Sequence, residues 1–151
     1  MFQGNSGTAI FSNTTFSGNN AQSTGGAIRI NGGTVTLRSS IVSNNSNGNC
    51  SGAPTDGGFN LQFGGGTANS CGATIATRDP LLAPLGNYGG PTQTFALLPG
   101  SPAIDIIPPG TNGCGTTINI DQRGVVRPQG NACDIGAFEF RPPIYLPLIM
   151  R

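Results

Sequence analysis

The pattern of apolar and polar positions repeats along the first third of the chain. The run TAIFSNTTFSGNN, residues 8–20, recurs as TVTLRSSIVSNNS, residues 34–46, at an offset of 26 residues. Each copy holds two short alternating runs and ends in a corner rich in Asn and Ser. Alternation with a period of two predicts strands with one buried face. A repeat of this size, built from strands and turns, predicts a β-solenoid in which one repeat is one coil.

The second repeat has three strand-like sides. In GGAIRI, Ile28 and Ile30 share one face and Arg29 lies on the other, and the Asn-Gly-Gly turn that follows separates this side from the next. The three sides fall near residues 27–30, 35–37 and 41–43. We therefore predict an all-β fold, a right-handed parallel β-helix whose coils occupy residues 1–77.

The offset predicts which residues of neighbouring coils lie side by side. Equivalent sides of successive coils pair at about 4.8 Å, so Asn19 is expected next to Asn45. Stacked Asn side chains can form a hydrogen-bonded ladder, which gives these corners a structural role. The apolar positions Phe11, Phe16, Leu37 and Val42 are expected to point inward and form the core.

Two coils are fewer than the three or so that a solenoid needs for stability. Residues 59–63 supply a further run, in which Phe59, Leu61 and Phe63 alternate with Asn60 and Gln62, and ATIAT follows Cys71. This alternation predicts that the solenoid continues through this segment.

The sequence pattern changes at Arg78. Proline residues interrupt short apolar runs, no repeat is visible, and the block TTINIDQRGVVRPQGNACDIGAFEF folds around an Arg-Gly bend. We expect residues 78–140 to form a terminal coil and an irregular cap over the open end of the solenoid. Residues 141–151 form a Pro-rich linker and an apolar tail, Ile144–Arg151, which is too short to span a bilayer as a helix.

Composition favours a folded chain with few charges. The 151 residues include 25 Gly and 12 Pro, only 9% are charged, and the formal net charge is +1. All basic residues are Arg and they are scattered, so we expect no nucleic-acid partner. Apolar runs recur throughout, which favours one folded domain over disorder.

The four cysteines indicate the compartment. There is no His, and the spacings from Cys50 to Cys71 and from Cys114 to Cys133 lack the close pairs of zinc sites. Three disulfide pairings can be drawn; the sequential one closes two similar loops, each worth roughly 3 kcal/mol. Four buried free thiols are the alternative. Disulfides predict an oxidising compartment. Because MFQGNSGTAIF is no secretory signal, we expect a fragment whose export signal lies upstream.

The C-terminal motifs resemble a known family. DPLLAPLGNYGGPTQTFALLPGSPAID, followed by DQRGVVRPQGNACDIGAFE, is similar to the choice-of-anchor Q domain of bacterial exported proteins with right-handed parallel β-helix repeats. The resemblance covers roughly residues 25–140 and is most specific in the last sixty. It implies a secreted or cell-surface protein, but it brings neither catalytic residues nor a substrate. The segment after SPAID departs from the family, because Ile106, Ile107 and two prolines replace a small glycine turn.

The acidic residues are candidates for chemistry because hydrolases need paired carboxylates. Asp121, Asp134 and Glu139 are the only acids close enough in sequence. Arg123 stands two residues after Asp121 and suits a charge-assisted pair with Asp134 or Glu139. We therefore expect these four residues to form ion pairs in the cap, with no catalytic, cofactor or metal residues in this chain.

Two classes of function follow. The first is a non-enzymatic structural or adhesive module, secreted or at the cell surface, that self-associates through its open first coil or its C-terminal tail. The second is a polysaccharide-binding or pectate-lyase-like β-helix. A lyase needs clustered acids for Ca²⁺ and a base near the sugar, and the repeats contain no acid, so its active coils would lie upstream. A glycan is the other candidate partner; no transmembrane span is expected.

Overall fold

The computed structural model describes residues 2–4, 6–66 and 70–142. These residues form an all-β structure with short strands and long irregular connections, and they include one 3-10 helix, η2 (Thr111–Gly113). The strands are β1 (Phe2–Gly4), β2 (Thr8–Ser12), β3 (Thr15–Ser17), β4 (Ile28–Ile30), β5 (Thr34–Arg38), β6 (Ile41–Ser43), β7 (Cys50–Ser51), β8 (Thr55–Asp56), β9 (Leu61–Phe63) and β10 (Ala76–Thr77).

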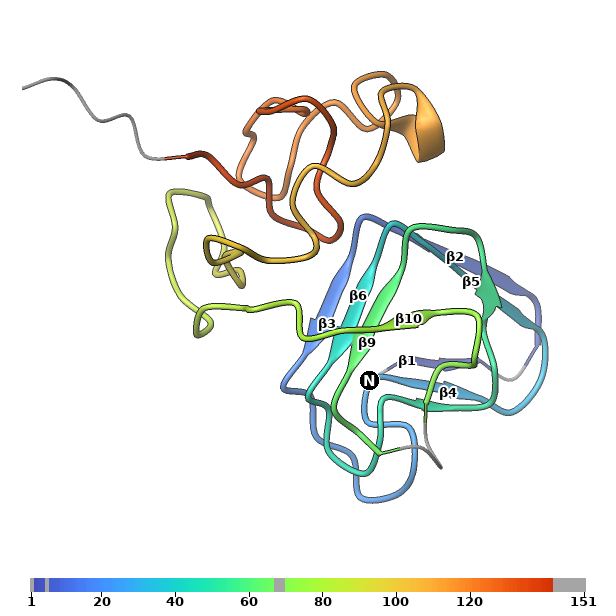
Figure 1. The fold of residues 1–151 in the computed structure, drawn as a ribbon. Coiled ribbons are helices and arrows are strands. Elements are labelled where there is room, and N and C mark those ends of the chain that lie inside the picture. The colour runs from blue at the N-terminus through green and yellow to red at the C-terminus, as the bar shows by residue number, and fades with distance from the viewer. Residues whose placement is uncertain (1, 5, 67–69, 143–151) are drawn as a thin grey trace, which may run out of the picture.

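The strands form three parallel sheets, with orders β1-β4-β7, β2-β5-β8 and β10-β9-β6-β3. Each pass of the chain contributes one strand to each sheet, so β1 to β3 make the first pass, β4 to β6 the second and β7 to β9 the third (Figure 1). Parallel strands that return to the same sheet once per pass are compatible with a parallel β-helix.

The 26-residue register of the first two passes is confirmed. Thr8 pairs with Thr34, and Phe16 pairs with Val42. The third pass is shorter, since Leu61 pairs with Ile41 only 20 residues earlier. The repeat is lost in the sequence at this pass although the strands continue in space.

The side chains inside the passes form one apolar cluster. Its buried members are Ala27, Ile28, Val35, Leu37, Val42, Cys50, Cys71 and Ile75, and Phe11, Phe16 and Ile30 pack against it. Leu37 and Val42 are fully buried. Phe11 and Phe16 meet edge to face, with ring centroids 5.1 Å apart. The predicted inward positions of the first two passes therefore form the core, with the first-pass aromatics only partly covered.

Residues 59–63 continue the passes as predicted, since β9 pairs with β6, but the side chain that faces the core is Gln62. Gln62 pairs with Val42 and continues the inward row, and only 4% of it is exposed. Its Nε2 donates to the carbonyl oxygens of Gly72 and Ile75, and its Oε1 accepts the Cys71 amide. The aromatic side chains of Phe59 and Phe63 are instead half-buried at the surface. A buried amide with partners for both of its polar atoms can replace an apolar residue at the end of a core.

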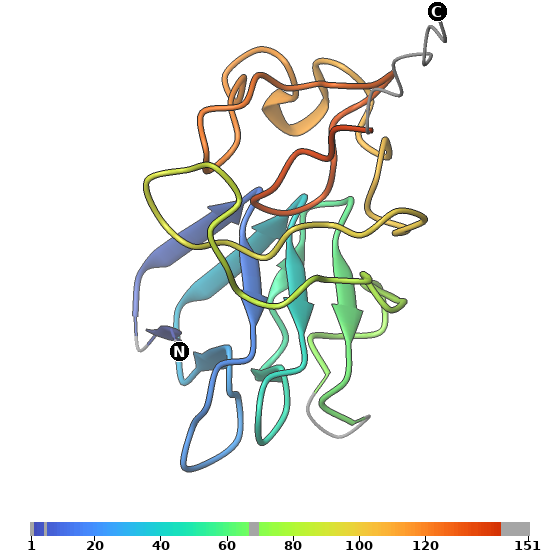
Figure 2. The same cartoon turned by 90° about the vertical axis from the view of Figure 1, so that its left-hand side faces the viewer.

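Residues 78–140, the C-terminal region, lie beside the passes rather than over their end. Figure 2 shows the segment after β10 running across the sheet of β3, β6 and β9. A second apolar cluster joins Ile41 and Leu61, on the outer face of this sheet, to Leu97, Ile135, Phe138 and other residues of the C-terminal region. The prediction that residues 78–140 cap the open end of the solenoid is therefore wrong. The sheet of β3, β6 and β9 has two apolar faces, and the C-terminal region buries the outer one.

Gly136 lies at a close contact between the two layers. Its backbone N–H donates to the Ser39 carbonyl oxygen at 2.8 Å. A Cβ atom at this position would lie 2.6 Å from Thr15 Oγ1 and 2.9 Å from Ile41 Cδ1, and the φ angle is +93°. Only glycine satisfies both the space and the conformation.

The C-terminal region contains no regular strand among its described residues. Isolated antiparallel bridges, such as Leu82 with Leu97 and Ile120 with Val126, hold its loops together. The tail predicted over Ile144–Arg151 lies outside the described residues. No helix in the described part of the chain has the length and apolar character of a membrane span.

Candidate functional site

Asn side chains connect the corners of three passes. Asn45, 3% exposed, accepts both the backbone N–H and the side-chain amide of Asn19 on its Oδ1, each at 2.9 Å. Its own Nδ2 donates to Asn49 Oδ1 at 3.0 Å, and Asn49 Nδ2 donates to the Gly64 carbonyl oxygen at 2.8 Å. Sequence reasoning missed Asn49 because it follows the repeat of residues 34–46, in the connection to β7.

The cysteines pair sequentially. Cys50 joins Cys71 inside the passes, and Cys114 joins Cys133 in the C-terminal region, with Cα–Cα distances of 4.9 Å and 5.9 Å. Each bridge belongs to a different apolar cluster. Two structural disulfides indicate a non-reducing environment.

Asp121 and Arg123 form the first ion pair of the C-terminal region. Arg123 donates to Asp121 Oδ2 from Nη2 at 2.7 Å and from Nε at 2.9 Å, and its guanidinium lies 3.5 Å from the Phe138 ring centroid. Burial alone would raise the pKa of Asp121, but hydrogen bonds from the Glu139 backbone amide and from Arg123 outweigh it and lower that pKa. Asp121 therefore remains a carboxylate that organises its own turn.

Arg127 and Glu139 form the second pair, at 2.7 Å, and both side chains are 1% exposed. Arg127 also donates to the carbonyl oxygens of Asp134 and Gly136. Burial raises the pKa of Glu139, and the charge of Arg127 opposes this rise. Arg127 was missed from the sequence because its partner lies 12 residues away across irregular loops.

Asp134 forms no salt bridge in the described part of the chain. Its carboxylate accepts the backbone N–H groups of Asp105 and Phe140. Burial raises its pKa to about 7. The ion pair predicted between Arg123 and Asp134 or Glu139 is wrong, since Arg123 pairs with Asp121 and contacts Glu139 only through its backbone carbonyl oxygen, at 2.6 Å.

The buried carboxylates accept hydrogen bonds from the main chain of the C-terminal region. Carboxylates of Asp121, Asp134 and Glu139 accept backbone N–H groups from loops that lack sheet partners, so they replace the missing sheet hydrogen bonds. Within the described residues, no three His, Cys, Asp or Glu side chains converge as a metal site would require. The arrangement stabilises loops and leaves its carboxylates engaged internally.

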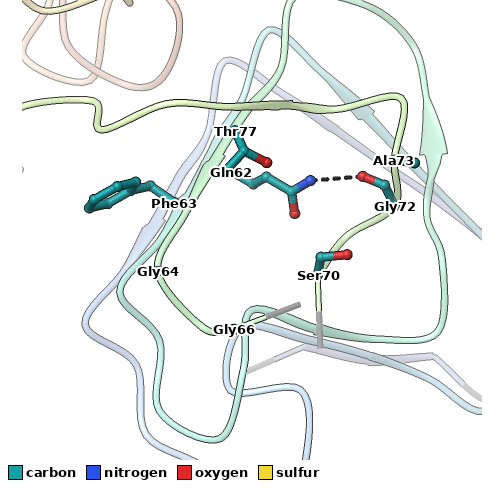
Figure 3. A pocket seen from close by; sticks show the side chains of 8 residues that line it. All are labelled: Gln62, Phe63, Gly64, Gly66, Ser70, Gly72, Ala73 and Thr77. Carbon is teal, nitrogen blue, oxygen red and sulfur yellow. Dashed lines mark hydrogen bonds between the residues drawn. The ribbon is translucent and has the colours of Figure 1, made fainter. Parts of the chain in front are cut away.

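Two cavities open at the surface of the described residues, and only the second is lined by any of these charged side chains. One, of about 340 Å³, opens beside Gln62, whose amide turns to the Gly72 carbonyl oxygen (Figure 3). The other, of about 400 Å³, lies between the turn at residues 12–15 and the C-terminal region. We call the second the junction groove, because it separates the first pass from Ile118, Ile120 and Gln122.

Comparisons with known proteins identify no relative: no protein-family model, no curated protein and no solved structure matches the chain.

Proposed function

We propose that this chain is a structural or adhesive module of a secreted or cell-surface protein, of the choice-of-anchor Q type, built on a right-handed parallel β-helix. The parallel sheets and the 26-residue register support the β-helix assignment. The two disulfides support an oxidising compartment outside the cytosol. The motifs of residues 79–105 and 121–139 support the family assignment.

The engagement of the buried carboxylates carries the non-enzymatic part of the proposal. Each of Asp121, Asp134 and Glu139 accepts backbone N–H groups, and two of them are also paired with an Arg. A general acid or base must reach a proton of the substrate. Carboxylates that hold the main chain of their own loops are suited to rigidity rather than turnover.

The edges of the three sheets support self-association. β1, β2 and β3 each stand at a sheet edge, so their outer backbone groups have no strand partner in the described part of the chain. Unpaired edges that belong to one pass can receive another pass of parallel strands. End-to-end assembly through the first pass is therefore part of the proposal.

A polysaccharide-cleavage assay distinguishes a structural or adhesive module from an enzyme. The protein is incubated with acidic and neutral polysaccharides in the presence of Ca²⁺, and soluble products and unsaturated sugar ends are measured. We expect none, together with retention on glycan-coated surfaces or on cells. Release of unsaturated sugars would overturn the non-enzymatic proposal and favour a lyase.

Light scattering over a range of protein concentrations tests self-association. We expect the mean mass to rise with concentration. A stable monomer at the highest concentration would contradict assembly through the edges of the first pass.

A further inference from the structure

Three Asn-Gly bonds lie outside the strands, and the side-chain amides of their Asn residues have different surroundings. The bonds are Asn31–Gly32, Asn47–Gly48 and Asn112–Gly113. The Asn47 amide nitrogen donates to the Ala21 carbonyl oxygen at 2.6 Å. The Asn112 amide nitrogen donates to the Ser39 hydroxyl at 3.1 Å. These two amides are held against other segments, so each must give up a hydrogen bond before it can bend back onto its own main chain.

Asn31 differs because a guanidinium contacts its amide oxygen. Asn31 follows β4 directly, and Arg29 Nε donates to Asn31 Oδ1 at 3.1 Å. Residues two apart along a strand project on the same face, which brings the two side chains together. Arg29 is also held from its other side, since its Nη1 donates to the Ser23 hydroxyl at 2.6 Å. Within the described ranges, the side-chain oxygens of Asn47 and Asn112 accept no hydrogen bond from an Arg.

The backbone nitrogen of Gly32 is the nucleophile beside this amide. Gly32 has no Cβ to obstruct the approach of the Asn31 side chain. Its N–H donates to no carbonyl oxygen in the part of the chain that the structure describes. Attack on Asn31 Cγ moves negative charge onto Oδ1, which is the atom that Arg29 contacts. A donor placed where charge develops in the transition state lowers the barrier.

We propose that Asn31 is a site of spontaneous deamidation, promoted by Arg29. The Gly32 nitrogen gives its proton to solvent and bonds to Asn31 Cγ, and Oδ1 carries the negative charge of the tetrahedral intermediate. Nδ2 takes up a proton, the Cγ–Nδ2 bond breaks, and ammonia leaves a succinimide. Water then opens the ring at either carbonyl carbon and yields aspartate or isoaspartate. The net reaction consumes water and releases ammonia, and neither an oxidant nor a reductant takes part.

The product changes the turn between β4 and β5. A carboxylate replaces the amide beside Arg29, and isoaspartate also adds a methylene to the main chain just before Gly33. This glycine packs on the first pass, since a Cβ there would lie 2.4 Å from the Gly7 carbonyl oxygen. The Thr34 backbone N–H donates to the same oxygen at 2.9 Å. Isoaspartate should therefore loosen the second pass from the first at this turn.

Deamidation of this kind goes beyond the structural role proposed above. Its failure would leave that role intact, because the disulfides, the register and the carboxylate contacts do not depend on it.

Peptide mapping by mass spectrometry on the intact, disulfide-bonded protein tests the proposal. The protein is kept at mildly alkaline pH and digested at intervals, and fragmentation assigns each exchange of amide for carboxylate to a residue. Trypsin releases residues 30–38, in which Asn31 is the only Asn. We expect Asn31 to deamidate at least about fivefold faster than Asn47 and Asn112. In denaturant the three rates should converge, because the contacts that distinguish them are lost.

A matched pair of variants tests the part of Arg29. Arg29→Met and Arg38→Met both remove one guanidinium and keep an unbranched side chain, and only Arg29 contacts Asn31. Arg38 lies at an exposed position of β5. We expect Arg29→Met to slow the deamidation of Asn31 about threefold, a modest factor because water screens an exposed contact. Arg38→Met should leave the rate unchanged.

Three outcomes would overturn the proposal. They are deamidation of Asn47 or Asn112 as fast as that of Asn31 in the folded protein, equal rates in Arg29→Met and Arg38→Met, and a lead of Asn31 that persists unchanged in denaturant. Circular dichroism shows whether each variant keeps the fold. The comparison of the three sites in the unmodified protein does not depend on any variant.

Discussion

The Asn112 side-chain amide, in η2, donates a hydrogen bond of 3.1 Å to the Ser39 hydroxyl, in the turn between β5 and β6. The same amide lies 3.3 Å and 3.4 Å from the carbonyl oxygens of Gly57 and Gly58, in the corresponding turn of the third pass. One side chain thus ties the C-terminal region to two successive passes. Because the two partners are 73 residues apart, this contact joins the two layers of the fold.

Replacement of this amide should loosen the attachment. Asn112 has a φ angle of +48°, so Asn112→Gly removes the hydrogen bonds without backbone strain. We expect the free energy of unfolding to fall by about 1–2 kcal/mol in chemical denaturation. Asn44→Gly, at φ +53° on an exposed corner, has the same entropic cost without the contact. Equal losses in the two variants would show that the contact contributes nothing.

The Asn corner gives a graded prediction. Asn45 is buried and exchanges hydrogen bonds with Asn19, Asn49 and two carbonyl oxygens, whereas Asn19 is half-buried at the first pass. Asn45→Ala leaves several buried groups unpaired, so we expect a loss of about 2–3 kcal/mol, against about 1 kcal/mol for Asn19→Ala. Thermal unfolding of both variants measures the difference. A larger effect of Asn19→Ala would contradict a ladder centred on Asn45.

The first two passes could be predicted from the sequence because their offset is constant. A fixed offset determines both the strand positions and the pairing of Asn19 with Asn45. The third pass could not be predicted in the same way. It is shorter, and its inward row contains Gln62, whose polar atoms find partners only once residues 71–75 fold back over it.

One feature of the sequence does indicate that the C-terminal region packs on the outer face of the sheet, although a search for alternating apolar and polar residues does not detect it. Ile41 and Val42 are consecutive and both buried, one in each apolar cluster. Consecutive apolar residues in a short strand are typical of a sheet covered on both faces. The pairing of Arg127 with Glu139 left no comparable signal, because irregular loops have no period from which to infer contacts.

The disulfide of the C-terminal region should support the outer cluster alone. Replacing both Cys114 and Cys133 with Ser removes a disulfide whose cysteines are 19 residues apart in sequence. We expect the free energy of unfolding to fall by about 3 kcal/mol. Hydrogen exchange should show faster opening of residues around Ile107 and Ile135, which share this cluster, while amides of β5, whose buried residues belong to the other cluster, stay protected. The matched removal of Cys50–Cys71 should reverse this pattern. Uniform loss of protection in both variants would contradict two separable clusters.

Buried Asp134 should make stability depend on pH. Its folded pKa is about 7, against 3.8 ordinarily, so the folded state keeps a proton that the unfolded chain releases between these values. The free energy of unfolding should therefore fall as pH rises from about 4 to about 7. Denaturation across this range should show a shallower fall for Asp134→Asn, whatever its absolute stability, because the titrating group is gone. Asp79→Asn, at an exposed position, matches the change of charge. An unchanged slope in Asp134→Asn would assign the pH dependence to other groups, of which Glu139, whose pKa burial also raises, is the first to test.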